Sequence, residues 1–234
     1  MKIALLGYGK MGKVIEKIAL QRGHEIVMRK SSSASFNGLE NADIAIDFSV
    51  PSAAVTNVST CLNQGIPIVS GTTGWLDEYE TMVSLCQKEN GAFIYGSNFS
   101  LGVNLFFELN DYLAKIMSKF NQYQVEMEEI HHTQKLDAPS GTAISLAKGI
   151  INNSHYQNWV LDNPKVNEIL IDAKRIENVP GTHSVIYNSE VDSIEIKHIA
   201  HNREGFALGS VIAAEWLLGK KGVFTMKDVL NLKE

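Results

Sequence analysis

Apolar residues along the chain follow two patterns that alternate from one segment to the next. Short apolar runs, typical of buried strands, occupy residues 1–6, 24–28, 42–48, 66–69 and 92–95. Between them, apolar side chains recur at helical spacing over residues 14–21, 52–63 and 77–88. This alternation of strands and helices predicts an α/β domain of the Rossmann type, with a parallel sheet.

The pattern changes after residue 99, which indicates a second, smaller domain. An apolar-rich helix is expected over residues 103–117, followed by an alternating strand over residues 123–130. Further elements are predicted as a helix over 141–151, a strand over 168–176 and a hairpin over 183–198 with its turn at 189–192. These elements predict an α+β domain with an antiparallel or mixed sheet. The last helix, residues 206–218, has the apolar character of a Rossmann helix and is expected to return to the first domain.

A glycine-rich turn directly follows the first strand. It has the spacing G-x-G-x-x-G within a strand–turn–helix–strand order of about 30 residues, the context in which this motif binds dinucleotides. The first glycine permits the tight turn, the second lets the backbone approach a pyrophosphate, and the third lets helix and strand pack closely. The alternative is a turn that binds no nucleotide. The candidate cofactor-binding residues here are Gly7, Tyr8, Gly9, Lys10, Met11 and Gly12.

The segment after the second strand bears on the choice of cofactor. Enzymes that prefer NAD usually place an acid there, which hydrogen-bonds the adenosine ribose. This chain instead has Arg29 and Lys30 followed by serines at positions 31–33. Two cations and three hydroxyls favour the 2′-phosphate of NADPH, so we expect NADPH to be preferred over NADH. A solvated basic loop is the alternative.

The segment from residue 129 to residue 143 concentrates reactive side chains. His131, His132 and Lys135 could hold an anionic substrate and protonate it near neutral pH. The following helix start, at Ser140, Gly141 and Thr142, offers the N–H groups and hydroxyls that bind a carboxylate.

Other interpretations of this segment remain open. Paired histidines could be metal ligands, but adjacent strand residues point to opposite faces and no third ligand stands at zinc spacing, so we expect no metal. They could also be core or surface residues. Asp137, before Ala138 and Pro139, is expected to be a turn or cap residue and is left out of the catalytic set.

A second polar cluster occupies residues 198–209, where the chain is expected to leave the smaller domain. Arg203 could bind a carboxylate bidentately, or it could brace the domain junction through an ion pair. His183, which follows Pro180, Gly181 and Thr182, is a weaker candidate for the same role.

Composition and charge narrow the function classes. With 234 residues, of which 44% are hydrophobic, the chain can bury one large or two modest cores. A net charge of −5 argues against general nucleic-acid or membrane binding, so we expect a small-molecule partner. Two cysteines without CxxC spacing favour a reducing compartment, and the apolar start is too short for a signal peptide or a membrane span. A cytoplasmic protein is therefore expected.

Taken together, six segments resemble the bacterial 4-hydroxy-tetrahydrodipicolinate reductases, also called dihydrodipicolinate reductases. In order they are GYGKMG (7–12), DFSVP (47–51), SGTTG (70–74), SNFSLGVN (97–104), EIHHTQKLDAPSGTA (129–143) and HNREGFALG (201–209). The resemblance spans nearly the whole chain. It implies NAD(P)H-dependent reduction of (2S,4S)-4-hydroxy-2,3,4,5-tetrahydrodipicolinate to tetrahydrodipicolinate, with loss of water, in lysine and diaminopimelate biosynthesis.

The resemblance also implies a role for each candidate residue. His131 would be the proton donor and Lys135 its companion acid, while the substrate would be bound by His132, Ser140, Gly141, Thr142 and Arg203. The cofactor cleft would be completed by Gly71, Thr72, Thr73, Gly96, Ser97, Asn98 and Phe99. Residues 1–101 and 204–234 would form the dinucleotide-binding domain. Residues 102–203 would form a substrate-binding and oligomerisation domain, whose open sheet supports a homotetramer, with hinge closure between the two.

Two other functions remain open from the sequence. A nucleotide-sensing protein without turnover would need the glycine-rich loop but not the His–His–Lys set. A different oxidoreductase acting on an imine or an amino acid would be protected by a different carboxylated ligand.

Overall fold

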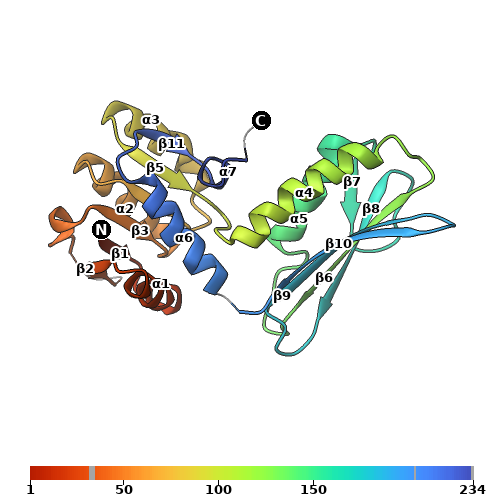
Figure 1. The fold of residues 1–234 in the computed structure, drawn as a ribbon, viewed down its shortest axis with the longest axis horizontal. Coiled ribbons are helices and arrows are strands. Elements are labelled where there is room, and N and C mark those ends of the chain that lie inside the picture. The colour runs from red at the N-terminus through yellow and green to blue at the C-terminus, as the bar shows by residue number, and fades with distance from the viewer. Residues whose placement is uncertain (32–34, 203, 233–234) are drawn as a thin grey trace. The chain divides into compact units, whose positions relative to one another are not determined.

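The computed structural model describes residues 1–31, 35–202 and 204–232, and the chain divides into two compact units (Figure 1). The first unit combines Met1–Leu101 with the chain from Glu204 onward, and the second begins at Gly102. Each unit has its own sheet and its own buried core. The first unit is therefore made from both ends of the sequence.

The sheet of the first unit has six parallel strands in the order β11-β5-β4-β3-β1-β2. The central strands are buried on both faces, which explains their unbroken apolar runs. The strands are β1 (Lys2–Leu6), β2 (Glu25–Lys30), β3 (Ile44–Asp47), β4 (Ile68–Ser70), β5 (Ala92–Tyr95) and β11 (Gly222–Phe224).

Helices cover both faces of this sheet. On one face, α1 (Lys10–Gln21) and α6 (Glu204–Leu217) pack against each other and share a core, to which α6 contributes Ala207 and Val211. On the other face, α2 (Pro51–Asn63) and α3 (Tyr79–Lys88) bury side chains such as Val58 and Cys86. Short elements complete the unit: η1 (Leu39–Asn41), η2 (Leu76–Glu78) and α7 (Met226–Val229).

The second unit has a five-stranded mixed sheet in the order β10-β9-β6-β8-β7. Strand β6 lies at its centre, parallel to β8 and antiparallel to β9. The strands are β6 (Gln124–His131), β7 (Asn158–Val160), β8 (Glu168–Arg175), β9 (Gly181–Asn188) and β10 (Ser193–Ala200). Two helices, α4 (Leu101–Met117) and α5 (Gly141–Asn153), share one core with the sheet and lie on one side of it (Figure 1).

The predicted fold class is confirmed: a Rossmann-type parallel sheet accompanies a smaller α+β unit with a mixed sheet. Strands β7 and β11 and helix α7 were not predicted. Each strand has only three residues, too few for a periodicity to show, and β11 is moreover defined by pairing with the distant strand β5. Among the described residues, no helix combines the length and apolar character needed to cross a bilayer.

Candidate active site

The glycine-rich turn has the geometry that its spacing predicts. Gly7 has φ +96°, and a Cβ atom there would lie 2.2 Å from the carbonyl oxygen of Phe48. A Cβ at Gly12 would lie 2.5 Å from the carbonyl oxygen of Gly7, whereas one at Gly9 would meet nothing within 4 Å. Gly7 and Gly12 are thus required for close packing, and Gly9 leaves open space in front of the backbone.

A pocket of about 560 Å³ lies beside this turn. Helix α1 begins at its rim with no side-chain cap and with no acid in its first turn, so its first N–H groups can receive an anion. These features fit the diphosphate of a dinucleotide. The pocket is lined by Gly7, Tyr8, Gly9, Lys30, Ser31, Phe48, Ser49, Val50, Ser52, Ala53 and Asn57.

The two cations of the second strand both have protein partners. Arg29 forms an ion pair with Glu16 of α1, donating from Nε at 2.9 Å, and its guanidinium lies 5.9 Å from the centre of the Tyr8 ring. The Tyr8 hydroxyl donates to the same carboxylate. Glu16 therefore has a pKa below its usual range, chiefly because of the hydrogen bond from Arg29. Lys30 is buried, with its ammonium 4.8 Å from the centre of the Phe36 ring.

Residues 32–34 lie outside the described part of the chain, so the predicted role of Ser32 and Ser33 is not tested. Lys10 is exposed at the start of α1, and Met11 packs against the core of the first unit.

A fully buried carboxylate, Asp47, organises the next loops of the sheet edge. It accepts hydrogen bonds from Asn57 Nδ2 (2.8 Å), Ser70 Oγ (2.9 Å) and Thr72 Oγ1 (2.8 Å). Thr72 Oγ1 in turn accepts from the backbone N–H of Ser49 at 2.8 Å. Asp47 thereby ties the end of β3 to the loop after β4.

The loops after β4 and β5 both pack closely. A Cβ at Gly71 would lie 2.3 Å from the Phe48 ring, and one at Gly96 would lie 3.1 Å from the Phe99 ring. Phe99 is buried and its carbonyl oxygen faces Gly209 of α6, so its side chain packs in the core of the first unit. Thr73 and Ser97 are exposed and Asn98 is half-buried.

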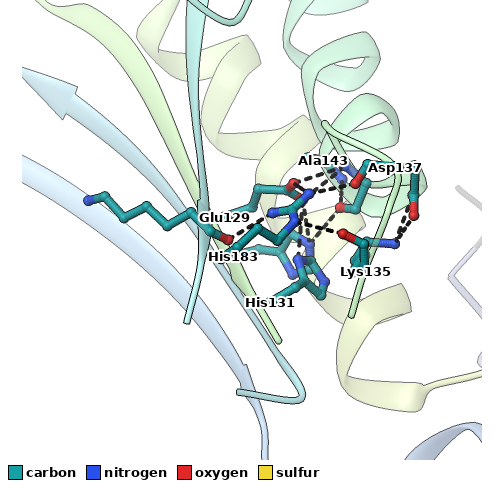
Figure 2. A network of polar contacts seen from close by, with 9 residues as sticks. Glu129, His131, Lys135, Asp137, Ala143 and His183 are labelled. Atoms are coloured by element: carbon teal, nitrogen blue, oxygen red, sulfur yellow. Dashed lines mark hydrogen bonds and ion pairs between the residues drawn. The ribbon is translucent and has the colours of Figure 1, made fainter. Parts of the chain in front are cut away.

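In the second unit, strand β6 delivers Glu129 and His131 to one buried face (Figure 2). The strand alternates, so Val125, Met127, Glu129 and His131 share that face. Glu129 is completely buried, and both of its carboxylate oxygens accept from the backbone N–H of Ser140, at 3.1 and 3.0 Å. The carboxylate thus meets the start of α5, where negative charge is favoured.

Arg175, from the end of β8, neutralises Glu129. Its Nη2 donates to Glu129 at 3.2 Å and to the carbonyl oxygen of Asp137, and its Nε donates to the carbonyl oxygen of Lys135 at 3.3 Å. One guanidinium therefore connects the buried acid to the loop that carries Lys135. Lys135 itself forms an ion pair with Asp137 at 2.7 Å. Asp137 is therefore the ion-pair partner of Lys135. The expectation that it is a turn or cap residue was wrong, because it lies outside the turn at residues 133–134 and the cap of α5 is Ser140.

Two histidine rings pack side by side beside Glu129. The rings of His131 and His183 are 5.1 Å apart and nearly perpendicular. His183 Nε2 lies 3.1 Å from Ser140 Oγ, and burial, followed by repulsion from His131, lowers the pKa of His183 to about 3. Burial also lowers the pKa of His131, while the charge of Glu129 opposes that shift. His183 is thus a neutral wall of the site.

The start of α5 shows which of its residues remain accessible. Ser140 is buried as the N-cap, and its Oγ accepts from the backbone N–H of Ala143 at 3.2 Å. Gly141 is exposed, with nothing within 4 Å of a Cβ position, and Thr142 is half-buried. Ser140 therefore shapes the helix start, whereas Gly141 and Thr142 can face a ligand.

His132 belongs to a different pocket of the second unit, with a volume of about 590 Å³. Its walls are His132, Thr133, Gln134, Glu177, Asn178, Val179, Pro180, His201 and Asn202. Arg203, the other expected carboxylate ligand, lies outside the described residues.

One group of described side chains has metal-ligating geometry: Glu129, His131 and His183 offer ligand atoms within 4.8 Å of one another. This group cannot be recognised from local sequence, because its third member, His183, is distant along the chain. The carboxylate, however, is already neutralised by Arg175 and by the N–H of Ser140, and Lys135 lies nearby. These cationic neighbours oppose the binding of a metal ion, so Glu129 is better suited to holding nearby side chains in place than to ligating a cation.

Sequence reasoning missed three residues: Glu129, Arg175 and Asp47. The alternation of β6 offered a signal for Glu129, because it puts a carboxylate on the face that otherwise carries apolar residues. Asp47 ends an apolar run, which is a similar signal. Nothing local to Arg175 marks it.

Comparison with known proteins gives a consistent result. The family model described as dihydrodipicolinate reductase, N-terminus, matches residues 1–99, and that for the C-terminus matches residues 102–230. The 4-hydroxy-tetrahydrodipicolinate reductase of Christiangramia forsetii is 57% identical, over 99% of this chain and 98% of the relative. The one from Methanosarcina barkeri is 34% identical, over 96% of this chain and 83% of the relative.

Solved structures agree on the fold. The dipicolinate-bound dihydrodipicolinate reductase of Paenisporosarcina sp. TG-14 has a TM-score of 0.78 at 23% identity, covering 96% of this chain and 97% of that one. A probable dehydrogenase from Thermotoga maritima has a TM-score of 0.59 at 9% identity, covering 100% and 90%.

Proposed function

The chain belongs to the dihydrodipicolinate reductase family, and we propose how its residues carry out the NAD(P)H-dependent reduction of 4-hydroxy-tetrahydrodipicolinate to tetrahydrodipicolinate with loss of water. The reaction serves lysine and diaminopimelate biosynthesis. In this proposal, residues 1–101 and 204–234 bind the dinucleotide, and residues 102–203 bind the substrate and form the contacts between subunits.

The first unit fits a nicotinamide dinucleotide. The open space at Gly9 and the uncapped start of α1 suit a diphosphate, and the adjoining pocket of about 560 Å³ can take a nucleoside. When bound, the reduced nicotinamide supplies the hydride that is delivered to C4 of the substrate. The loops at residues 71–73 and 96–99 form the rest of the cofactor cleft, with Asp47 fixing the first of them through Thr72.

The second unit binds a dicarboxylate. Gly141 and Thr142 present the N–H groups of the α5 start to one carboxylate, and Ser140 holds that start in place as its cap. His132 contributes from its neighbouring pocket. Arg203 remains a candidate ligand from the sequence alone.

His131 is the proton donor and Lys135 is its companion acid. Burial lowers the pKa of both histidines, but the charge of Glu129 opposes that shift at His131, whereas the pKa of His183 falls to about 3, so His131 is the better proton donor of the two. Lys135 assists departure of the C4 hydroxyl as water. The cationic groups of the site also stabilise the electron-rich species that forms. The observation that carries this proposal is the convergence of His131, Lys135 and the α5 start around Glu129 and Arg175 (Figure 2).

The test is absorbance at 340 nm, with substrate freshly made by a coupled synthase and with NADPH or NADH in parallel. Substrate-dependent oxidation is expected, and His131→Gln should lower kcat roughly 100-fold, the scale of losing a general acid. A near-normal rate would remove His131 from the donor role. Cofactor binding without any oxidation would favour a nucleotide-sensing protein.

Three finer points belong to the same proposal. NADPH is preferred over NADH, since Lys30 and Ser31 line the cofactor pocket and no acid of β2 stands there. The protein is a homotetramer joined through the sheet of the second unit, whose edge strand β10 exposes Ile194 and Ile199. It resides in the cytoplasm, which two buried free thiols favour. The ratio of the KM values for NADPH and NADH tests the first point, and light scattering tests the second.

A further inference from the structure

Glu129 is a carboxylate that is completely buried in the second unit. Its exposed fraction is 0%, and a buried carboxylate is tolerated only when it is paired and hydrogen-bonded. The N–H of Ser140 and the guanidinium of Arg175 supply that compensation. They do not explain why one oxygen also faces two imidazoles, with Oε2 3.5 Å from His131 Nδ1 and 3.7 Å from His183 Nε2.

The Nδ1 atom of His131 is the unsatisfied imidazole nitrogen that faces Glu129, whereas His183 turns its Nε2 to the same carboxylate and its own Nδ1 is also without a partner among the described residues. His131 Nδ1 is buried and has no hydrogen-bond partner among the described residues. The distance of 3.5 Å to Glu129 exceeds that of a normal N–H···O bond by only about 0.6 Å, which a small ring movement can close. Catalytic hydrogen bonds are often long in free enzymes and shorten when the substrate is bound.

The other nitrogen of His131 lies against a residue without a side chain. A Cβ added at Gly181 would come within 3.2 Å of His131 Nε2, so glycine keeps this edge of the ring clear. If Nδ1–H is donated to Glu129, Nε2 is the atom left to exchange a proton with the substrate. The ring of His183 packs edge-on against that of His131, with 5.1 Å between the ring centres, and is neutral.

We propose that Glu129 is a positioning residue for the reduction, whose carboxylate holds His131 through Nδ1 so that Nε2 faces the substrate, while the same carboxylate fixes the α5 start that receives a substrate carboxylate. This inference rests on the proposed role of His131 as the proton donor. It assigns Glu129 no contact with the substrate.

The charged and titratable groups that face His131 are Glu129 from β6, Arg175 from β8, His183 from β9, and Lys135 and Asp137 from the loop after β6. Among them, Glu129 is the strongest influence that raises the pKa of His131. Its neutralisation should therefore move the fall of kcat/KM, which occurs as His131 loses its proton, to lower pH.

Glu129→Gln is compared with Glu128→Gln, a matched control on the same strand. Glu128 is the adjacent residue, but it points to the other face and pairs with Lys174 and not with the histidines. We expect Glu129→Gln to lower kcat about 10- to 100-fold and to shift the pH profile, with the cofactor KM unchanged. Glu128→Gln should keep the wild-type kcat and profile.

A double-mutant cycle with His131→Gln separates the inference from its premise. If Glu129 acts through His131, Glu129→Gln should add little once His131 is replaced. A normal rate for His131→Gln alone would overturn the donor role. The other outcome is that His131→Gln is slow, and that adding Glu129→Gln lowers its rate by the same factor as in the wild type. That result would leave the donor role of His131 intact and overturn the positioning role of Glu129.

Should Glu129→Gln fail to fold, the wild-type chain still tests the inference. The protein is labelled with ¹⁵N-histidine and bound to pyridine-2,6-dicarboxylate, a planar dicarboxylate probe. Neutral His131 is expected as the Nδ1–H tautomer. Observation of the Nε2–H tautomer would overturn the proposal.

Discussion

Replacing Asp47 by Asn tests whether one buried carboxylate shapes the cofactor cleft. The amide has nearly the same shape, so no cavity forms. Its carbonyl oxygen can keep the bond from Asn57, but its NH₂ group then faces the hydroxyls of Ser70 and Thr72. Thr72 Oγ1 already accepts from Ser49, so its hydroxyl hydrogen would lose its acceptor.

The cost follows from these contacts. Hydrogen bonds to charged groups contribute about 1.5–3 kcal/mol and neutral ones about 0.5–1.5 kcal/mol, so two weakened bonds lose about 2 kcal/mol. An unsatisfied buried hydroxyl adds about 1–3 kcal/mol, and relief of the buried charge offsets part of this sum. We expect a net loss of about 2–4 kcal/mol in the free energy of unfolding, together with a higher cofactor KM.

Urea denaturation followed by tryptophan fluorescence measures this loss, because the Trp75 indole donates to the Thr72 carbonyl and reports on this loop. The matched control is Asp43→Asn: Asp43 is exposed and accepts from the backbone N–H of Lys2, so its change should cost less than about 1 kcal/mol. Unchanged unfolding of Asp47→Asn would refute the energetic argument. Lower stability with an unchanged cofactor KM would refute the role in the cleft.

Three further predictions follow from contacts in both units. Glu16→Gln should release Arg29 and lower the KM for NADPH relative to that for NADH by up to about tenfold, the scale of one charge-assisted hydrogen bond. An unchanged ratio of the two KM values would show that Arg29 does not select the cofactor. Gly209→Ala would place Cβ 1.7 Å from the Phe99 carbonyl oxygen and should lower the free energy of unfolding by at least about 1–3 kcal/mol. Gly205→Ala in the same helix, where the nearest contact is 3.5 Å, should leave stability unchanged, and similar melting temperatures for the two variants would contradict this packing. Because burial holds the pKa of His183 near 3, against 6.5 for a free histidine, the unfolded chain binds a proton that the folded one does not. Stability should therefore decrease as pH falls from 6.5 towards 3, and His183→Asn should flatten that dependence in acid titrations followed by circular dichroism.

The fold was largely predictable because most of its longer strands are either almost uniformly buried, like β1 and β3, or alternate between buried and more exposed positions, like β6. The run at residues 42–48 and the alternation at residues 123–130 correspond to β3 and β6, with bounds that differ by one or two residues. The short strand β11 could not be found in this way, since it exists through pairing with β5 more than a hundred residues earlier. Local pattern records which face a residue occupies, but it does not record which strand lies beside it.

The candidate site shows the same division. Sequence placed His131, Lys135 and the helix start in one segment, where chain connectivity keeps them close. It did not reveal Arg175, which arrives from β8 through the order of the sheet, and it noted His183 of β9 without placing it beside His131. Likewise, the two cations Arg29 and Lys30 were visible in the sequence, although they end β2 and do not follow it. The acid that pairs with Arg29 is Glu16 of α1, which the local sequence does not indicate.

The first unit's discontinuity has a consequence for synthesis of the protein. Its core needs Ala207, Val211 and Leu217 of α6, and its sheet needs β11, yet both are translated after the entire second unit. A nascent chain that has reached β5 therefore carries an incomplete sheet edge and an uncovered apolar face next to α1. The second unit, which is contiguous, has all of its strands before α6 is made. On the ribosome, the later-encoded unit can thus finish folding first, while the earlier one waits for the final helix.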